Sequence, residues 1–127
     1  MLERTIYYHD TDAVGIAYYG SYFKFLEEGR TEFFQSKGVS VKGLHEKGFF
    51  FVVTDLKAKY LSPARFGDVV LCESRIADIA AAQVFFSQRI IKKEDGDVLL
   101  EAEITLVIVD KDFQPVAIPE DVRALLS

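Results

Sequence analysis

Residues 19–38 read YGSYFKFLEEGRTEFFQSKG, and the pattern of this stretch decides the fold. Aromatic and aliphatic side chains recur near the helical period from Tyr22 to Phe34, while Lys and Glu fill most of the other positions. Gly38 is the residue type that commonly ends a helix. Gly29 costs about 1 kcal/mol relative to Ala inside a helix, which suggests that another backbone packs closely against it. The stretch predicts one long helix over residues 19–37 with an aromatic inner stripe.

Strand-forming segments surround this helix. Residues 2–8 are rich in Thr, Ile and Tyr, and four later segments are dense in Val, Ile and Phe: 49–60, 68–78, 83–93 and 98–110. The connections between these later segments are short, so we expect neighbours to pair as an antiparallel meander. Two shorter helices are expected, one capped by Ser40 and ending near Lys47, the other from Pro119 to about Leu126. The prediction is an α+β fold in which one antiparallel sheet wraps a single long helix.

Composition places the chain in a broad class. It has 127 residues, 50% of them hydrophobic, with no repeat or linker, which is typical of one globular domain over residues 1–127. A net charge of −5 argues against bulk electrostatic binding to nucleic acid or anionic lipid. No apolar run approaches the ~20 residues of a membrane span, so we expect no integral membrane segment. The lone Cys72 excludes an intrachain disulfide and favours a cytoplasmic location.

The predicted sheet leaves a long edge strand that one helix cannot cover. Proteins commonly protect such an edge by pairing it with another chain. We therefore expect a homo-oligomer whose sheet continues between subunits, with dimer and tetramer both open.

The densest cluster of reactive residue types is the loop HDTDAVG at residues 9–15, which precedes the long helix. Free amides at a helix start can hold a developing oxyanion, and a nearby carboxylate can attack a carbonyl or activate water. A second interpretation is that Asp10 and Asp12 only stabilise turns, since acidic residues are common in such loops. A metal site on His9, Asp10 and Asp12 lacks supporting Cys/His spacing. A phosphotransferase motif at Asp10-x-Asp12-x-Val14 would require a parallel sheet that the pattern does not predict.

A family resemblance covers the same segment. Residues 8–32, reading YHDTDAVGIAYYGSYFKFLEEGRTE, resemble the opening segment of the 4-hydroxybenzoyl-CoA thioesterase family, and within it the YbgC-like acyl-CoA thioesterases. Residues 60–68 (YLSPARFGD) and 86–90 (FSQRI) resemble two later segments of that family. The resemblance implies the hotdog fold and the hydrolysis of an acyl-CoA or acyl-carrier-protein thioester.

The resemblance also implies roles for individual residues. Asp12 matches the catalytic carboxylate, as nucleophile or as general base, and Asp10 matches its structural partner. The backbone amide of Tyr19 matches the donor that polarises the thioester carbonyl. Gly15 and Gly20, which lie in the matching segment, are expected to contact substrate. The resemblance implies no metal and no cofactor apart from the coenzyme A of the substrate.

The chain departs from the family pattern at two places. Tyr19 stands where a His is common, and residues 78–82 lack the basic side chains expected to bind the nucleotide phosphates. Lys57, Lys59 and Arg65 are candidates to supply that charge instead. These departures keep a second hypothesis open, a non-catalytic acyl-thioester-binding or assembly protein with the same fold. A hotdog hydratase or dehydratase is a third, although its His/Asp arrangement is not matched by His9 and His45.

Overall fold

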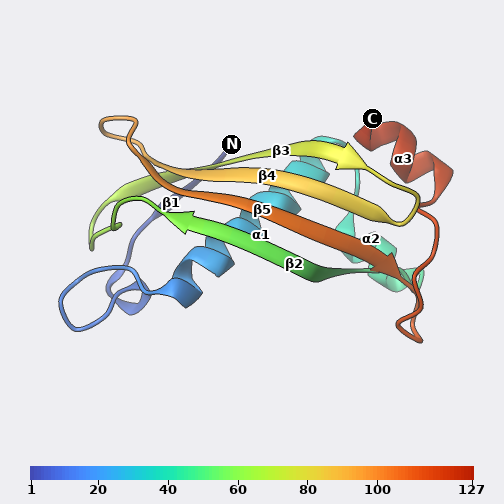
Figure 1. Cartoon of the computed structure of the whole chain (residues 1–127), viewed down its shortest axis with the longest axis horizontal. Helices are drawn as coiled ribbons and strands as arrows, with labels where there is room; N and C mark the ends of the chain where they lie inside the picture. Colours follow the sequence, from blue (N-terminus) through green and yellow to red (C-terminus); the bar gives the residue numbers. More distant parts are fainter.

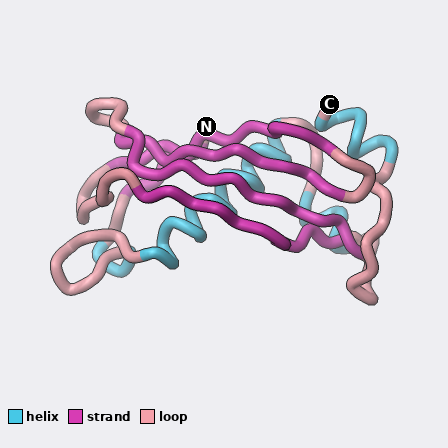
Figure 2. The backbone as a smooth tube through the Cα atoms, viewed as in Figure 1, coloured by secondary structure: helices cyan, strands magenta, loops and turns pink.

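A computed structural model describes all of residues 1–127. Its elements are β1 (Leu2–Thr5), the 3-10 turn η1 (Tyr8–Asp10), α1 (Tyr19–Ser36), α2 (Val41–Glu46), β2 (Phe50–Tyr60), β3 (Val69–Ile79), β4 (Gln83–Lys92), β5 (Val98–Val109) and α3 (Glu120–Leu126). The five strands form one antiparallel sheet in the order β1-β3-β4-β5-β2. In Figure 1 the sheet crosses in front of α1, and the tube of Figure 2 shows loops gathered at both ends of the strands. The expected α+β architecture, a sheet around one long helix, is confirmed.

The predicted long helix forms because its apolar stripe faces the sheet. Tyr22, Phe25, Leu26 and Phe34 are buried on this side of α1. The Phe34 ring stacks on Phe51 of β2 with a centroid separation of 4.9 Å. Complete burial of such a side chain stabilises the fold by roughly 1.5–3 kcal/mol, so this stripe holds α1 against the sheet.

The close approach at Gly29 is made by a side chain and not by a backbone, which corrects the expectation. A Cβ on Gly29 would lie 2.5 Å from Cys72 Sγ, 3.3 Å from Cys72 Cβ and 3.2 Å from Ser74 Oγ. Cys72 and Ser74 belong to β3, so the missing side chain at residue 29 lets α1 settle on that strand. Burial raises the pKa of the Cys72 thiol to about 11.

Substituting Gly29→Ala should lower the free energy of unfolding by about 1–3 kcal/mol, the usual cost of overpacking a core. Helix propensity alone predicts the opposite sign, because Ala is favoured over Gly by about 1 kcal/mol. The variant Cys72→Ala removes the sulfur, so the double variant should recover stability beyond the sum of the single changes. Urea unfolding of the parent, the two single variants and the double variant measures the coupling energy between residues 29 and 72. A Gly29→Ala protein as stable as the parent would show that the contact does not select the glycine.

The predicted meander is wrong at one connection. β2 pairs with β5 at one edge of the sheet, whereas β3 lies between β1 and β4. The intervening bend is therefore a crossing at the end of the sheet and not a hairpin. Its centre, Ala64, is fully buried: the Ala64 N–H donates to Tyr22 Oη at 3.0 Å, and its carbonyl accepts the Ala17 N–H at 2.8 Å. The bend packs under the start of α1, and in this way the chain crosses from β2 at one edge of the sheet to β3 near the other edge.

The remaining predicted elements are confirmed, with β1 shorter than expected. Strand pairing stops at Thr5 because residues 7–10 turn back on themselves, with the Asp10 N–H donating to the Tyr7 carbonyl at 3.0 Å. Ser40 caps α2, accepting the Gly43 N–H at 2.9 Å. No helix in the chain combines the length and apolarity needed to cross a membrane.

Candidate functional site

The loop between η1 and α1 holds Asp12 in an internally bonded turn. The Asp12 N–H donates to the Ile16 carbonyl at 2.9 Å, and the Gly15 N–H donates to the Asp12 carbonyl at 3.1 Å. Asp12 Oδ1 accepts the N–H groups of Val14 and Ile16 at 3.0 and 3.2 Å, whereas Oδ2 has no donor within the chain. Because Asp12 is exposed, the free oxygen is open to a reactant.

This turn geometry is not unique to Asp12. Asp110 Oδ1 likewise accepts the N–H groups of Asp112 and Gln114, at 2.9 and 3.0 Å, in a turn at the other end of the sheet. The hydrogen bonds therefore explain how each carboxylate is oriented. Whether a carboxylate can take part in a reaction depends on the groups that lie near it. Asp12 differs from Asp110 in lying seven residues before the start of α1.

α1 begins with unsatisfied amides. Its N-cap, Tyr18, is extended at φ −86° and ψ 166° and provides no side-chain cap. The Tyr18 N–H donates to the Asp10 carbonyl and the Ser21 N–H to the Tyr18 carbonyl, but the amides of Tyr19 and Gly20 have no acceptor in the chain. Such amides carry the positive end of the helix dipole and can bind an anion or a polarised carbonyl oxygen. The helix start thus presents two adjacent free donors.

An apolar hollow of about 250 Å³ opens beside these amides. It is lined by Ile16, Ala17, Tyr19, Tyr22, Tyr60, Leu61, Ser62 and Pro63. The Tyr60 ring contacts those of Tyr19 and Tyr22, at centroid separations of 5.0 and 5.5 Å. Burial raises the pKa of Tyr22 and of Tyr60, so both phenols remain protonated near neutral pH. The hollow offers a small, uncharged, ring-lined surface next to two hydrogen-bond donors.

Two of the predicted substrate-binding residues lie beside the Asp12 loop. Gly15 has a φ of +78°, a value that favours glycine, and its carbonyl accepts the Phe66 N–H at 2.9 Å. Arg65 forms an antiparallel bridge with Ile16 and is exposed. The bend at residues 61–67 therefore brings one cation to the loop that carries Asp12.

The two predicted lysines lie elsewhere. Lys57 and Lys59 project from the edge strand β2 onto the sheet face opposite α1, where they are paired in register with Glu103 and Glu101. Within one chain the structure does not bring them to the hollow. Their role in substrate binding stays a prediction.

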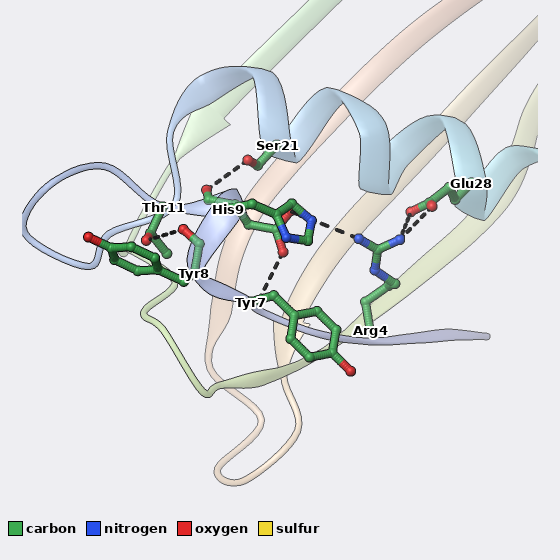
Figure 3. A network of polar contacts seen from close by, with 8 residues as sticks. Arg4, Tyr7, Tyr8, His9, Thr11, Ser21 and Glu28 are labelled. Atoms are coloured by element: carbon green, nitrogen blue, oxygen red, sulfur yellow. Dashed lines mark hydrogen bonds and ion pairs between the residues drawn. The ribbon is translucent and has the colours of Figure 1, made fainter.

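A partly buried network that the sequence pattern did not predict lies beneath the loop (Figure 3). Ser21, fully buried on α1, donates its hydroxyl to the Asp10 carbonyl at 2.7 Å. The Asp10 carboxylate is 2% exposed and accepts the Tyr7 N–H at 2.9 Å. Arg4 of β1 donates to both carboxylate oxygens of Glu28 on α1. The spacing of Asp10, eleven residues before Ser21, gives no periodic signal that predicts this contact.

A second missed pair lies deeper in the core. Arg30 of α1 is 8% exposed and donates to Gln88 Oε1 at 3.1 Å, while Gln88 Nε2 donates to the Leu26 carbonyl at 2.9 Å. Burial lowers the pKa of Arg30. Residue 30 falls four positions after Leu26 on the inner stripe, so the helical period does place it in the core.

Three comparisons with known proteins agree with this architecture. The family model described as the thioesterase-like superfamily matches residues 7–126. The acyl-CoA thioester hydrolase YbgC of Escherichia coli O157:H7 is 35% identical over 94% of this chain and 89% of its own length. The chloroplastic acyl-acyl carrier protein thioesterase ATL3 of Arabidopsis thaliana is 30% identical over 91% of this chain and 61% of its own. The crystal structure of hypothetical protein TT1821 from Thermus thermophilus superposes with a TM-score of 0.92 and 27% identity, covering 98% of this chain and 95% of that one.

Proposed function

The chain belongs to the thioesterase-like superfamily, and from that premise we propose that it hydrolyses the thioester of an acyl-CoA or an acyl-carrier protein. The products are the free acid and the thiol. One observation carries the proposal: α1 begins, shortly after the loop of Asp12, with the free amides of Tyr19 and Gly20, and Tyr19 also lines an apolar hollow. Thioester hydrolysis needs an N–H that donates to the thioester carbonyl, a place for the acyl group and a carboxylate.

In this proposal each part has a separate task. The Tyr19 amide donates to the thioester oxygen and stabilises the negative charge that develops there, an effect worth roughly 2.7–4 kcal/mol for one donor. Asp12, held through Oδ1, uses Oδ2 either to attack the carbonyl carbon or to take a proton from the attacking water. The thiolate leaves and is protonated. In the nucleophilic route an anhydride between Asp12 and the acyl group forms as the C–S bond breaks, and water then hydrolyses it. When that water attacks the aspartyl carbon, a single turnover in ¹⁸O-labelled water releases acid that carries an unlabelled Asp12 oxygen and leaves ¹⁸O in Asp12, whereas the general-base route puts ¹⁸O in the acid.

The size of the hollow limits the acyl group. At about 250 Å³ it is below the roughly 300–1,000 Å³ of pockets for drug-sized ligands, so we expect short acyl groups or a single ring. In an acyl-CoA panel, kcat/KM for butyryl- or benzoyl-CoA should exceed that for palmitoyl-CoA at least about tenfold. Preference for the palmitoyl group would show that the acyl chain extends beyond the hollow of a single chain. Of the predicted cations, we assign the coenzyme A phosphates to Arg65, because it is exposed and bridges Ile16 of the Asp12 loop.

We also propose that the active form is at least a dimer, joined through β2. This strand has eleven residues and a free edge. Its side chains Val53, Leu56 and Tyr60 remain 36–48% exposed. They lie on the α1-facing side, because they pair in register with the buried Leu106, Ile104 and Leu100 of β5. A second copy paired to β2 would complete the sheet and cover these side chains. Light scattering should give a mass of at least twice 14.4 kDa, and a stable, active monomer would contradict the proposal.

A further inference from the structure

Besides its contacts with Ala64, the start of α1 is bonded to the Asp10 carbonyl on both sides of the free amides. The Asp10 carbonyl accepts the Ser21 hydroxyl at 2.7 Å and the Tyr18 N–H at 3.3 Å. Tyr18 and Ser21 flank the two residues whose amides are free. The direction in which those amides point is therefore set by the position of Asp10.

The Asp10 side chain is itself fixed from the other side. Its Oδ2 accepts the Tyr7 N–H at 2.9 Å, and its Oδ1 lies 4.0 Å from Arg4 Nη2. Because this carboxylate is 2% exposed, water screens its attraction to Arg4 only weakly. The exposed His9 ring also reaches it, with Nε2 3.4 Å from Oδ1.

Arg4 in turn is held on α1. Its Nη1 lies 2.7 and 2.5 Å from the two carboxylate oxygens of Glu28, and its guanidinium lies 5.0 Å from the centroid of the Phe25 ring. Glu28 and Phe25 lie in the middle of α1, and Ser21 lies in its first turn. A path therefore runs from the helix middle through Arg4 and Asp10 back to the helix start (Figure 3).

Asp12 depends on the same anchor. Its loop is bonded internally and to the bend at residues 61–67, through the Phe66 N–H bond to the Gly15 carbonyl. The residues on either side of the loop, Asp10 and Tyr18, are joined by the Tyr18 N–H bond to the Asp10 carbonyl. We propose that Arg4, Asp10 and Ser21, the Arg4–Asp10–Ser21 clamp, are positioning residues that fix the Asp12 carboxylate relative to the Tyr19 and Gly20 amides. The inference rests on the proposed function, because it concerns the geometry of that reaction. A displacement near 1 Å at a reacting group can cost about 100-fold in rate.

Ser21→Ala tests the clamp most cleanly, because it removes one hydroxyl and leaves the Asp10 carbonyl bonded to the Tyr18 N–H. We expect kcat to fall between about 10- and 100-fold with KM within about twofold of the parent. In an Asp12→Asn background the same change should have no further effect, because the aligned carboxylate is already gone. Glu3→Gln is the matched control. Glu3 lies next to Arg4 on β1 and forms an exposed 2.7 Å ion pair with Lys93, which the substitution removes. This change should leave kcat unchanged.

The kinetics of Ser21→Ala can overturn the proposed clamp. Parental kcat in Ser21→Ala, or an equal loss in the Asp12→Asn background, overturns the clamp. If circular dichroism shows that Ser21→Ala is unfolded, Asp10→Asn, which keeps an acceptor for the Tyr7 N–H, is judged by the same two readouts. A parent that hydrolyses no thioester contradicts the proposed function instead. Hydrogen exchange over residues 11–20 then tests the clamp alone: faster exchange in Ser21→Ala than in Glu3→Gln supports it, and equal rates overturn it.

Discussion

Asp12→Asn should lower kcat for thioester hydrolysis by about 10²–10⁴-fold, the range over which a positioned acid–base group contributes. The substitution is nearly isosteric, and the amide oxygen can still accept the Val14 and Ile16 N–H groups that hold Oδ1. The loop should therefore persist while the negative charge is lost. Steady-state kinetics with the best substrate of the panel measures the effect, and thermal unfolding should show a nearly unchanged Tm.

The matched control is Asp110→Asn. Asp110 makes the same pair of hydrogen bonds through Oδ1, in a turn remote from the start of α1. If Asp12→Asn lowered kcat only because a weakened turn destabilised the fold, Asp110→Asn should destabilise the fold and lower kcat as well. We expect Asp110→Asn to keep parental kcat. An Asp12→Asn protein with parental turnover would remove Asp12 from the reaction.

Tyr19→Pro should lower kcat by about 10²–10³-fold by deleting one backbone donor. Proline is favoured at the first helical position, because the N–H there has no partner within the helix. The preceding residue must be extended, and Tyr18 already is, at φ −86° and ψ 166°. The helix should therefore form normally, so far-UV circular dichroism should match the parent.

Tyr19→Ala separates the amide from the side chain. It keeps the N–H and removes the phenol, which the proposed role does not need. Its kcat should stay within about tenfold of the parent, because a ring contact that binds the substrate and the transition state equally changes KM and leaves kcat unchanged. If Tyr19→Ala and Tyr19→Pro lose activity equally, the ring and not the amide is the functional part of this residue.

Local pattern was sufficient to predict the elements, and insufficient to predict their order in the sheet. The period of residues 19–37 and the β-forming segments depend on nearby residues, and both agree with the structure. The place of β2 beside β5 depends on a long-range fact, the burial of Ala64 under Tyr22. A short connection favours a hairpin only when its residues face solvent, and a single sequence does not show that Ala64 is buried.

The candidate site divides in the same way. Asp12, Gly15, Tyr19 and Gly20 were grouped by the family resemblance, and they follow one another along the chain. Ser21 and Arg4 were missed because their partners are brought close only by the folded chain, as the bond from Ser21 to the Asp10 carbonyl shows. Lys57 was proposed from charge alone, and strand alternation places it on the opposite sheet face.

The central claim, that this chain hydrolyses acyl thioesters, is tested most directly by free-thiol release across short, branched, aromatic and long acyl-CoAs, with thermal shifts recorded in parallel. Cys72 adds little background because it is buried and its thiol pKa is raised to about 11. We predict equimolar release of thiol and acid from at least one short or aromatic acyl-CoA, and a strong reduction of that release in Asp12→Asn. Thermal shifts with several acyl-CoAs and no thiol release from any would contradict the account and identify a non-catalytic acyl-thioester-binding protein.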